Sequence, residues 1–292
     1  MNPLLQTVVA DSDLVSVMDG IKSGLREQLV AGLSGSARQV MIAGLFRELQ
    51  RPILIVSHNM FSAQKIAEDL QECLSEEEVL LYPANELIAA ETAISSPETS
   101  ARRLDVLLKL AGGFRGIVIV PFAGIRRFQP DRQAISDARI ELKVGMALPL
   151  EKFIHGLTAL GYERVDRVEQ KGHFSVRGGI VDFFPLASAE AFRVEWFDDE
   201  IDSIRTFDPA DQRSINRLEA YTVGPCREIV ADSSRFENAA QHARSLLDAQ
   251  LEKMTDRQAK ERLEAEISRE IDLLRQNIYF PEIYKYISLL YP

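Results

Sequence analysis

The segment GLSGSARQ, residues 32–39, has the outline of a phosphate-binding loop. In the pattern GxxxxGK[ST], backbone amides and a helix amino terminus hold the phosphates, while the lysine and the hydroxyl residue serve phosphate and magnesium. Gly32 fills the first glycine position, and Gly35 lies inside the loop. Ala37 replaces the second glycine and resists positive φ, Arg38 replaces the compact ammonium, and Gln39 replaces the magnesium-binding hydroxyl. We expect this degenerate loop not to bind nucleotide, and we expect no cofactor.

Other residues that are capable of catalysis lack the partners that catalysis needs. Asp199 and Glu200 are adjacent acids, but they lie in a predicted hairpin turn and not at the end of a core strand, where phosphoryl transfer needs them. Ser34 and Ser36 have no histidine partner to activate a hydroxyl. The 4 histidines are scattered without metal-ligand spacing: His58, His155, His173 and His242. The sequence therefore predicts neither a catalytic nor a metal site.

A second set of charged residues alternates with apolar ones between Gly161 and Asp208. Arg177 follows the alternation of Phe174 and Val176, and Arg193 and Glu195 alternate with the apolar residues of the segment FRVEW. Period-2 alternation is typical of strands with one buried face. We expect hairpin turns at Lys171-Gly172 and Asp198-Asp199, a bulge at Gly178-Gly179 and a strand end at Pro185. The polar face of this antiparallel sheet is the best candidate for a functional surface.

The first 125 residues alternate between helix and strand patterns. We expect helices near residues 14–26, 37–50 and 60–74 and from Ser96-Pro97-Glu98 onward, and strands at 28–31, 53–56, 79–82 and 116–122. After His58, Asn59 is expected to cap a helix rather than to face a ligand. This order predicts a parallel α/β sheet covered on both faces.

The pattern changes after residue 125. A strand at 140–144, a helix at 150–160 and the strand-rich stretch predict an inserted α+β domain, and residues 233–277 predict either an antiparallel helix pair or one long helix. The predicted fold is an α/β, degenerate P-loop-type domain (1–125), an inserted antiparallel-sheet domain (126–214) and a helical return segment (215–292) that packs on the first domain. The apolar end, IYKYISLLYP, indicates that the natural sequence continues.

Composition limits the classes of function. The 292 residues carry 44 acids against 34 bases, a formal charge of −10 that disfavours nucleic acid as the default partner. The 2 cysteines, Cys73 and Cys226, are far apart, which favours a reduced, cytoplasmic protein over a disulfide or zinc scaffold. No signal peptide or membrane-spanning run is found in the sequence, so we expect no membrane partner.

Several segments together carry a family resemblance: QLVAGLSGSARQVMIAGL, RPILIVSHNMFSAQKIAEDL, GYERVDRVEQKGHFSVRGGIVDFFP and FRVEWFDDEID. Across essentially the whole chain they resemble the amino-terminal region of the bacterial transcription-repair coupling factors, the Mfd family. That region is itself similar to the excision-repair helicase UvrB. The resemblance implies a degenerate nucleotide-binding-type domain, an inserted domain that binds the damage-recognition ATPase UvrA, and a return segment.

Two departures favour this family over UvrB. An active UvrB would carry an intact GK[ST] and a tyrosine-rich hairpin that stacks on bases, whereas this chain has YPANE at residues 82–86 and then a short connection to Ser96. The resemblance places the UvrA contact on Arg164 of the GYER segment, Arg177 of VRG and Glu195 of RVE. Ser175 stands where the family has a further arginine. Phe174 and Arg193 are added as flanking contacts.

The sequence therefore predicts a non-catalytic recruitment module of nucleotide excision repair that binds UvrA through its inserted domain. The resemblance implies that the full-length protein is an ATP-dependent DNA translocase that also contacts RNA polymerase, DNA and its own carboxy-terminal domain, which masks the UvrA surface. The alternative is a fragment of a UvrB-like ATPase or helicase that acts on damaged DNA. A DNA-binding module is a third class, disfavoured by charge and by the absent hairpin.

Overall fold

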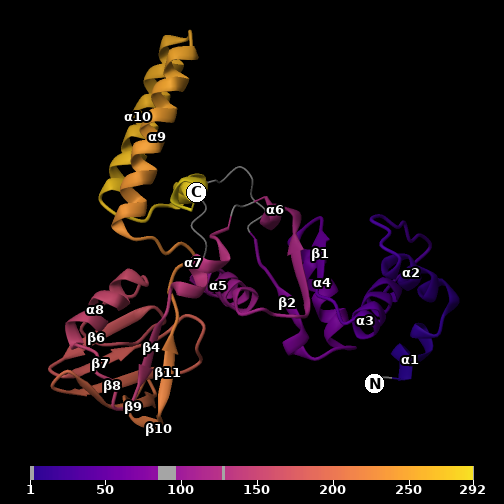
Figure 1. Ribbon diagram of the computed structural model, residues 1–292, viewed down its shortest axis with the longest axis horizontal. Coiled ribbons are helices and arrows are strands. Elements are labelled where there is room, and N and C mark those ends of the chain that lie inside the picture. Colours follow the sequence, from indigo (N-terminus) through magenta and orange to yellow (C-terminus); the bar gives the residue numbers. More distant parts are fainter. Residues whose placement is uncertain (1–2, 85–96, 127–128, 292) are drawn as a thin grey trace. The chain divides into compact units, whose positions relative to one another are not determined.

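A computed structural model of the chain describes residues 3–84, 97–126 and 129–291 (Figure 1). It divides into two compact units. Unit 1 comprises Met1–Ile88 and Gly113–Arg127, and unit 2 comprises Ala89–Gly112 and Phe128–Pro292. Each unit is described by itself below.

Unit 1 combines helices with a small parallel sheet. Its helical elements are α1 (Pro3–Val9), α2 (Ser12–Lys22), α3 (Ala37–Leu49), α4 (Met60–Gln71), the 3-10 turn η1 (Glu76–Glu78) and α6 (Phe122–Ile125). Its strands are β1 (Ile53–Ser57), β2 (Val79–Leu81) and β3 (Ile117–Pro121), which pair in the order β1-β3-β2. Both strand pairs are parallel, as predicted.

One face of this sheet is packed against α3 and α4. Ile117 and Ile119 of β3 are fully buried there with Phe46 of α3 and Leu70 of α4. On the opposite face of β1, however, Leu54 is 59% exposed and Val56 is 47% exposed. The expectation of a sheet covered on both faces is therefore wrong for β1 within the described residues.

The segment before α3 also differs from its prediction. Residues 27–34 form no helix or strand, and Leu29 is 95% exposed. An apolar run becomes a strand only when a neighbouring strand accepts its backbone hydrogen bonds, and none pairs with residues 28–31 here. The helix predicted at residues 14–26 is α2, which ends at Lys22 and not near Arg26. Asn59 does cap α4, since its side chain accepts a 2.8 Å hydrogen bond from the Ser62 amide.

Unit 2 contains the remaining elements. Its helices are α5 (Pro97–Ala111), α7 (Arg132–Asp137), α8 (Leu150–Ala159), α9 (Ser233–Lys253), α10 (Arg257–Arg275), η2 (Pro281–Tyr286) and α11 (Ile287–Leu290). Its strands are β4 (Ile140–Lys143), β5 (Glu163–Arg164), β6 (His173–Arg177), β7 (Ile180–Phe183), β8 (Ala191–Phe197), β9 (Glu200–Phe207), β10 (Ser214–Leu218) and β11 (Ala220–Val223).

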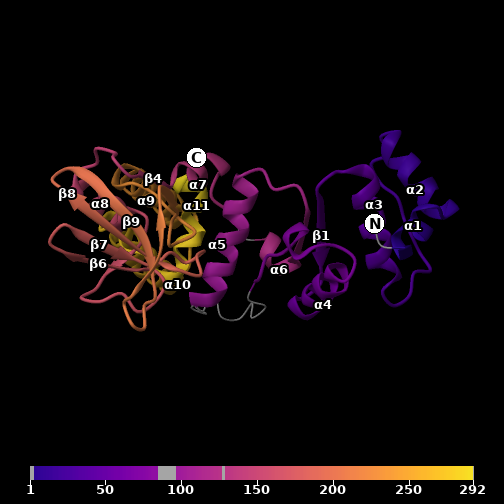
Figure 2. The same ribbon diagram turned by 90° about the horizontal axis from the view of Figure 1, so that it is seen from below.

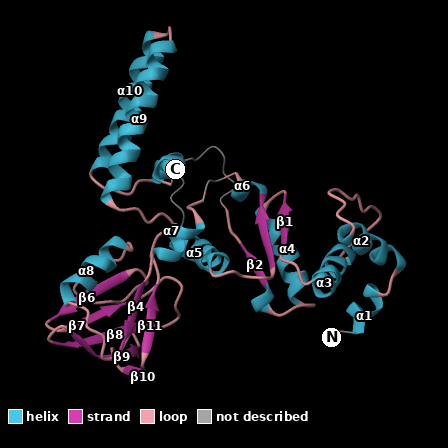
Figure 3. Ribbon diagram, viewed as in Figure 1, coloured by secondary structure: helices cyan, strands magenta, loops and turns pink. Residues whose placement is uncertain are grey.

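Six of these strands form one sheet in the order β10-β9-β8-β7-β6-β5, and β11 pairs with β4 (Figure 3). Helix α8 lies against the sheet in both views (Figures 1 and 2). Phe153 and Leu157 of α8 are fully buried in one core with Phe183 of β7 and Val194 of β8. The predicted antiparallel α+β arrangement is confirmed, while β10 and β11 were not predicted.

The glycine and aspartate residues singled out in the sequence form two of the turns of this sheet. Asp198, with φ of 55°, lies in the predicted hairpin turn between β8 and β9. Gly178-Gly179 forms the hairpin turn between β6 and β7 and not a bulge, with Gly178 at φ of 61°. Lys171-Gly172 does not join a hairpin, because β5 and β6 pair in parallel.

The long charged segment forms an antiparallel helix pair, α9 and α10 (Figure 1). Asp256 starts the second helix by accepting hydrogen bonds from the amides of Gln258 and Ala259. Ala240 of α9 and Ile271 of α10 are fully buried in the same core as Leu290 of α11. Over the part of the chain that the structure describes, no helix combines the length and apolar character needed to cross a bilayer.

Candidate protein-binding surface

The register of the sheet brings the predicted charged residues together on one face. Ser175 of β6 is opposite Asp182 of β7, which is opposite Arg193 of β8 and then Arg205 of β9. In the neighbouring row, Arg177 is opposite Ile180, which is opposite Glu195. We define the arginine face as the following residues: Arg177, Asp182, Arg193, Glu195 and Arg205.

Asp182 is the anionic centre of the arginine face. Its Oδ1 accepts a 2.7 Å hydrogen bond from Arg193 Nε, and its Oδ2 accepts bonds of 2.9 Å from Arg193 Nη2 and 2.6 Å from Arg177 Nη2. The Asp182 side chain is 1% exposed, whereas that of Arg193 is 16% and that of Arg177 is 54% exposed. Hydrogen bonding to Asp182 raises the pKa of Arg193. One buried carboxylate thus orients two guanidiniums, of which Arg177 reaches solvent.

Arg193 is held further by its surroundings. Its guanidinium carbon lies 4.8 Å from the centre of the Phe207 ring, and its Nη2 donates a 3.3 Å hydrogen bond to Gln212 Oε1. Gln212 also donates from Nε2 to the Val168 carbonyl oxygen at 3.4 Å. The loops that carry Val168 and Gln212 therefore border the arginine face at the Arg193 end.

Glu195 forms a second polar contact on the same face. Its Oε2 accepts a 2.9 Å hydrogen bond from Ser203 Oγ and a 3.3 Å hydrogen bond from Arg205 Nη2. The Glu195 side chain is 27% exposed and that of Arg205 is 36% exposed. Both charges are accessible to a partner because this ion pair is only half-buried.

Arg164 and Phe174 lie elsewhere. Arg164 is exposed on the edge strand β5, where it pairs in register with Phe174, so it does not share a row with Arg177. Phe174 is 1% exposed and belongs to the core beneath the sheet. The expectation that Phe174 contacts a partner is wrong for this conformation, because strand alternation directs its side chain inward.

Two residues of the arginine face were missed in the sequence. Asp182 lies between the buried Val181 and Phe183 in a mostly apolar strand, and Arg205 follows the fully buried Ile204 of β9. The same alternation that indicated Arg177 and Arg193 places both of them on the polar face. A charged residue inside an apolar strand was the signal that could have found Asp182.

The degenerate loop of residues 32–39 differs from a phosphate site in several respects. Gly32 and Gly35 have positive φ values of 84° and 56°, and α3 begins at Ala37. Arg38 is exposed, whereas Gln39 is 6% exposed. The strand that would position such a loop is not formed. In the described part of the chain, no group of three or more histidine, cysteine, aspartate or glutamate residues is placed to hold a metal ion.

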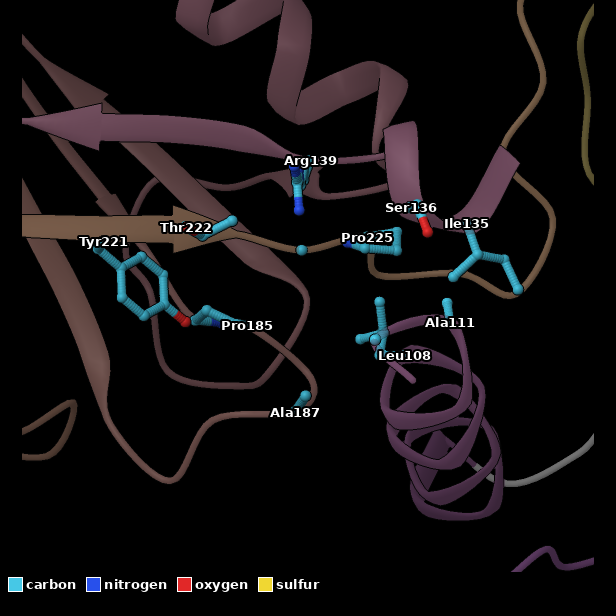
Figure 4. A pocket seen from close by; sticks show the side chains of 12 residues that line it. Leu108, Ala111, Ile135, Ser136, Arg139, Pro185, Ala187, Tyr221, Thr222 and Pro225 are labelled. Carbon is cyan, nitrogen blue, oxygen red and sulfur yellow. The ribbon is translucent and has the colours of Figure 1, made fainter. Parts of the chain in front are cut away.

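Unit 2 also contains a pocket of about 330 Å³ (Figure 4). Leu108 and Ala111 of α5 and Ile135 of α7 line it, and the Tyr221 ring lies opposite with its hydroxyl beside Pro185. Burial raises the pKa of Tyr221 to about 12, so its phenol is protonated at neutral pH. The described lining provides hydrogen-bonding groups and an arginine, Arg139, but no nucleophile paired with a base.

Known proteins resemble both the sheet domain and the whole chain. Residues 140–228 match the model of the UvrB interaction domain. Over 288 residues, or 98% of this chain, the sequence is 41% identical to the transcription-repair-coupling factor of Bacillus subtilis. The chain belongs to the transcription-repair-coupling factor family. The corresponding factor of Staphylococcus haemolyticus is 31% identical over 85% of the chain, and that of one Staphylococcus aureus strain is 36% identical over 68%.

The chain spans only a part of these relatives. It covers 24% of the length of the Bacillus subtilis transcription-repair-coupling factor and 21% of that of Staphylococcus haemolyticus. The match to the UvrB interaction domain begins at the first residue of β4 and includes β10 and β11. The arginine face therefore lies inside the matched domain.

Proposed function

We propose that this chain is a non-catalytic recruitment module of transcription-coupled nucleotide excision repair, which binds UvrA through the arginine face. One observation carries the proposal: Arg177, Arg193 and Glu195 share one sheet face, on which the Arg177 side chain is 54% exposed, within the segment that matches the UvrB interaction domain. Hydrogen-bonded arginines with fixed guanidiniums are frequent anchors of protein interfaces.

The non-catalytic part of the proposal has separate support. The loop of residues 32–39 lacks the lysine and the hydroxyl residue of a phosphate site, and residues 3–31, which the structure describes, form no strand before it. For the full-length protein, we propose an ATP-dependent DNA translocase whose other partners are RNA polymerase, DNA and its own carboxy-terminal domain. Those activities would reside outside this chain.

Alanine substitution of the accessible arginine tests the UvrA contact. Arg177→Ala removes a guanidinium that is half exposed and leaves Asp182 paired with Arg193, so we expect loss of UvrA pull-down with little change in melting temperature. Arg164→Ala should have the same effect if the contact extends to β5. Arg257→Ala on α10, where the side chain is 92% exposed, is the matched control and should bind as the wild type does. Unchanged binding in both test variants would remove the site assignment.

Nucleotide titration tests the alternative of a UvrB-like ATPase fragment. The proposal predicts no saturable ATP binding by this chain at micromolar concentrations, because Arg38 and Gln39 do not replace the missing phosphate and magnesium ligands. Saturable binding that Arg38→Ala abolishes would contradict the proposal and favour the ATPase alternative.

A further inference from the structure

We propose that the arginine face continues to the edge of the sheet through Arg217 and that an acidic protein segment of the partner binds there. This inference rests on the proposed function, because the partner is the protein that docks on the arginine face. The residues that carry it form what we call the arginine row: Arg193, Arg205 and Arg217.

The register places the arginine row on three adjacent strands. Arg193 of β8 is opposite Arg205 of β9, and Arg205 is opposite Arg217 of β10. The next residue, Leu218, is opposite the fully buried Ile204 and packs against the core, so Arg217 lies on the same face as Arg205. Since neighbouring strands are about 4.8 Å apart, three cationic side chains start within about 10 Å of one another.

Charge compensation decreases along the row toward the sheet edge. Arg193 makes two hydrogen bonds to the buried Asp182, and Arg205 makes a single 3.3 Å bond to Glu195. Arg217 is exposed, and no ion pair involving it is found in the described ranges. Positive charge is therefore least compensated at β10.

Three like charges in register are unfavourable for the isolated fold. Cross-strand neighbours of the same sign destabilise a sheet, and here they persist in a chain whose formal charge is −10. With Arg177, the face presents four arginines against the two carboxylates of Asp182 and Glu195. An acidic segment that places carboxylates over β9 and β10 would be attracted by the arginines and would reduce the repulsion among them.

The same charges favour a protein segment over nucleic acid. Glu195, whose side chain is 27% exposed, adds negative charge to the face, and the chain has a formal charge of −10, so both disfavour a phosphate backbone. A peptide can instead place acidic side chains beside the arginines and a polar one beside Glu195. Edge strand β10 is exposed along residues 214–217, so the partner can reach the row from the side of the sheet.

Binding of purified UvrA to charge variants tests the arginine row. We expect Arg217→Ala to weaken binding about threefold and Arg217→Glu about tenfold, with a shallower salt dependence, as rim charges act mainly through electrostatic attraction. Arg257→Ala should bind as the wild type does. Because Arg217 is exposed and makes no ion pair within the described residues, neither substitution should change the circular dichroism spectrum. If Arg217→Glu does change the spectrum, Arg217→Gln is measured in its place.

Arg177→Ala in the same series separates the two proposals. If Arg177→Ala loses UvrA while Arg217→Glu keeps both the affinity and the salt dependence of the wild type, the arginine row is overturned and the proposed function stands.

If the wild type does not bind UvrA, the proposed function is overturned, and poly-L-glutamate then tests the row alone. Salt-sensitive binding of poly-L-glutamate that Arg217→Glu weakens supports the row, and equal binding overturns it. A loss of duplex DNA binding by Arg217→Glu, with protein binding unchanged, also overturns it.

Discussion

At the scale of single residues, the buried Asp182 organises the candidate surface. Alternation in the sequence was enough to place Arg177, Arg193 and Glu195 on one face, but it did not indicate which anion orients them. Phe174 was predicted as a flanking contact, although alternation with Arg177 already placed it on the other face. The carboxylate that orients Arg177 and Arg193 lies on a neighbouring strand, and the sequence of one strand does not show which strand pairs with it.

Asp182→Ala should destabilise the fold. The substitution leaves the mostly buried Arg193 without its anion, and we expect a loss of about 3 kcal/mol in the free energy of unfolding, measured by urea denaturation. The exposed Asp202 of β9 provides the control, since Asp202→Ala should change stability by less than about 0.5 kcal/mol. Equal effects of the two substitutions would show that Asp182 does not organise the face.

Cys226 should be unreactive and should make the fold sensitive to alkali. Burial raises the pKa of its thiol to about 11, so iodoacetamide at pH 8 should modify Cys226 only after unfolding. The pKa of Cys226 in the folded chain lies above the unfolded value of about 8.5. The contribution of the protonated thiol to the stability of the fold is therefore complete below pH ~8.5 and is lost as the pH rises toward 11. Cys226→Ala should reduce this alkaline loss of urea stability. Equal labelling rates in native buffer and in urea would contradict the assignment.

At the scale of elements, most of the strands and helices that pack on one another in the described ranges were predicted from the sequence. β1, β2 and β3 formed as predicted because they pair with one another, and α9 and α10 formed because each carries an apolar stripe and an aspartate cap. Residues 28–31 have a strand-like sequence but pair with none of the strands that the structure describes. β10 was missed because most of its residues are exposed and show no alternation, and β11 because it is only 4 residues long.

A buried ion pair joins α5 to the segment after β11. Arg103 donates from Nε to Glu228 Oε1 at 2.8 Å, and the two side chains are 1% and 2% exposed. Arg103→Ala should therefore lower the free energy of unfolding by about 3 kcal/mol in urea denaturation, because it leaves a buried carboxylate. Its neighbour Arg102 pairs with Glu98 at the surface, so Arg102→Ala should cost less than about 0.5 kcal/mol. Similar losses from both would contradict the importance of this pair.

At the scale of the whole molecule, the division into parts at residues 125 and 214 stays a prediction. β10 and β11 follow residue 214, and they pair with β9 and β4, respectively. The matched UvrB interaction domain also extends to residue 228. Fold class and family could be predicted from sequence because they depend on local pattern and motif. The end of the inserted domain depends on which distant strands pair.

Two truncated chains test where the inserted domain ends. Residues 129–228 retain β10 and β11 and should unfold cooperatively in urea and bind UvrA. Residues 129–214 lack the partner of β4 and the edge of the six-stranded sheet, so they should show no cooperative transition. Cooperative unfolding of the shorter chain with full UvrA binding would favour the boundary at residue 214.

If UvrA covers the arginine face, arginine-selective chemical footprinting of the unmodified chain will detect the contact. With phenylglyoxal and mass spectrometry, saturating UvrA should protect Arg177, whose side chain is 54% exposed in the free chain, and should leave Arg257 of α10 as reactive as before. Stable complex formation with Arg177 still fully reactive would show that UvrA binds elsewhere on the chain.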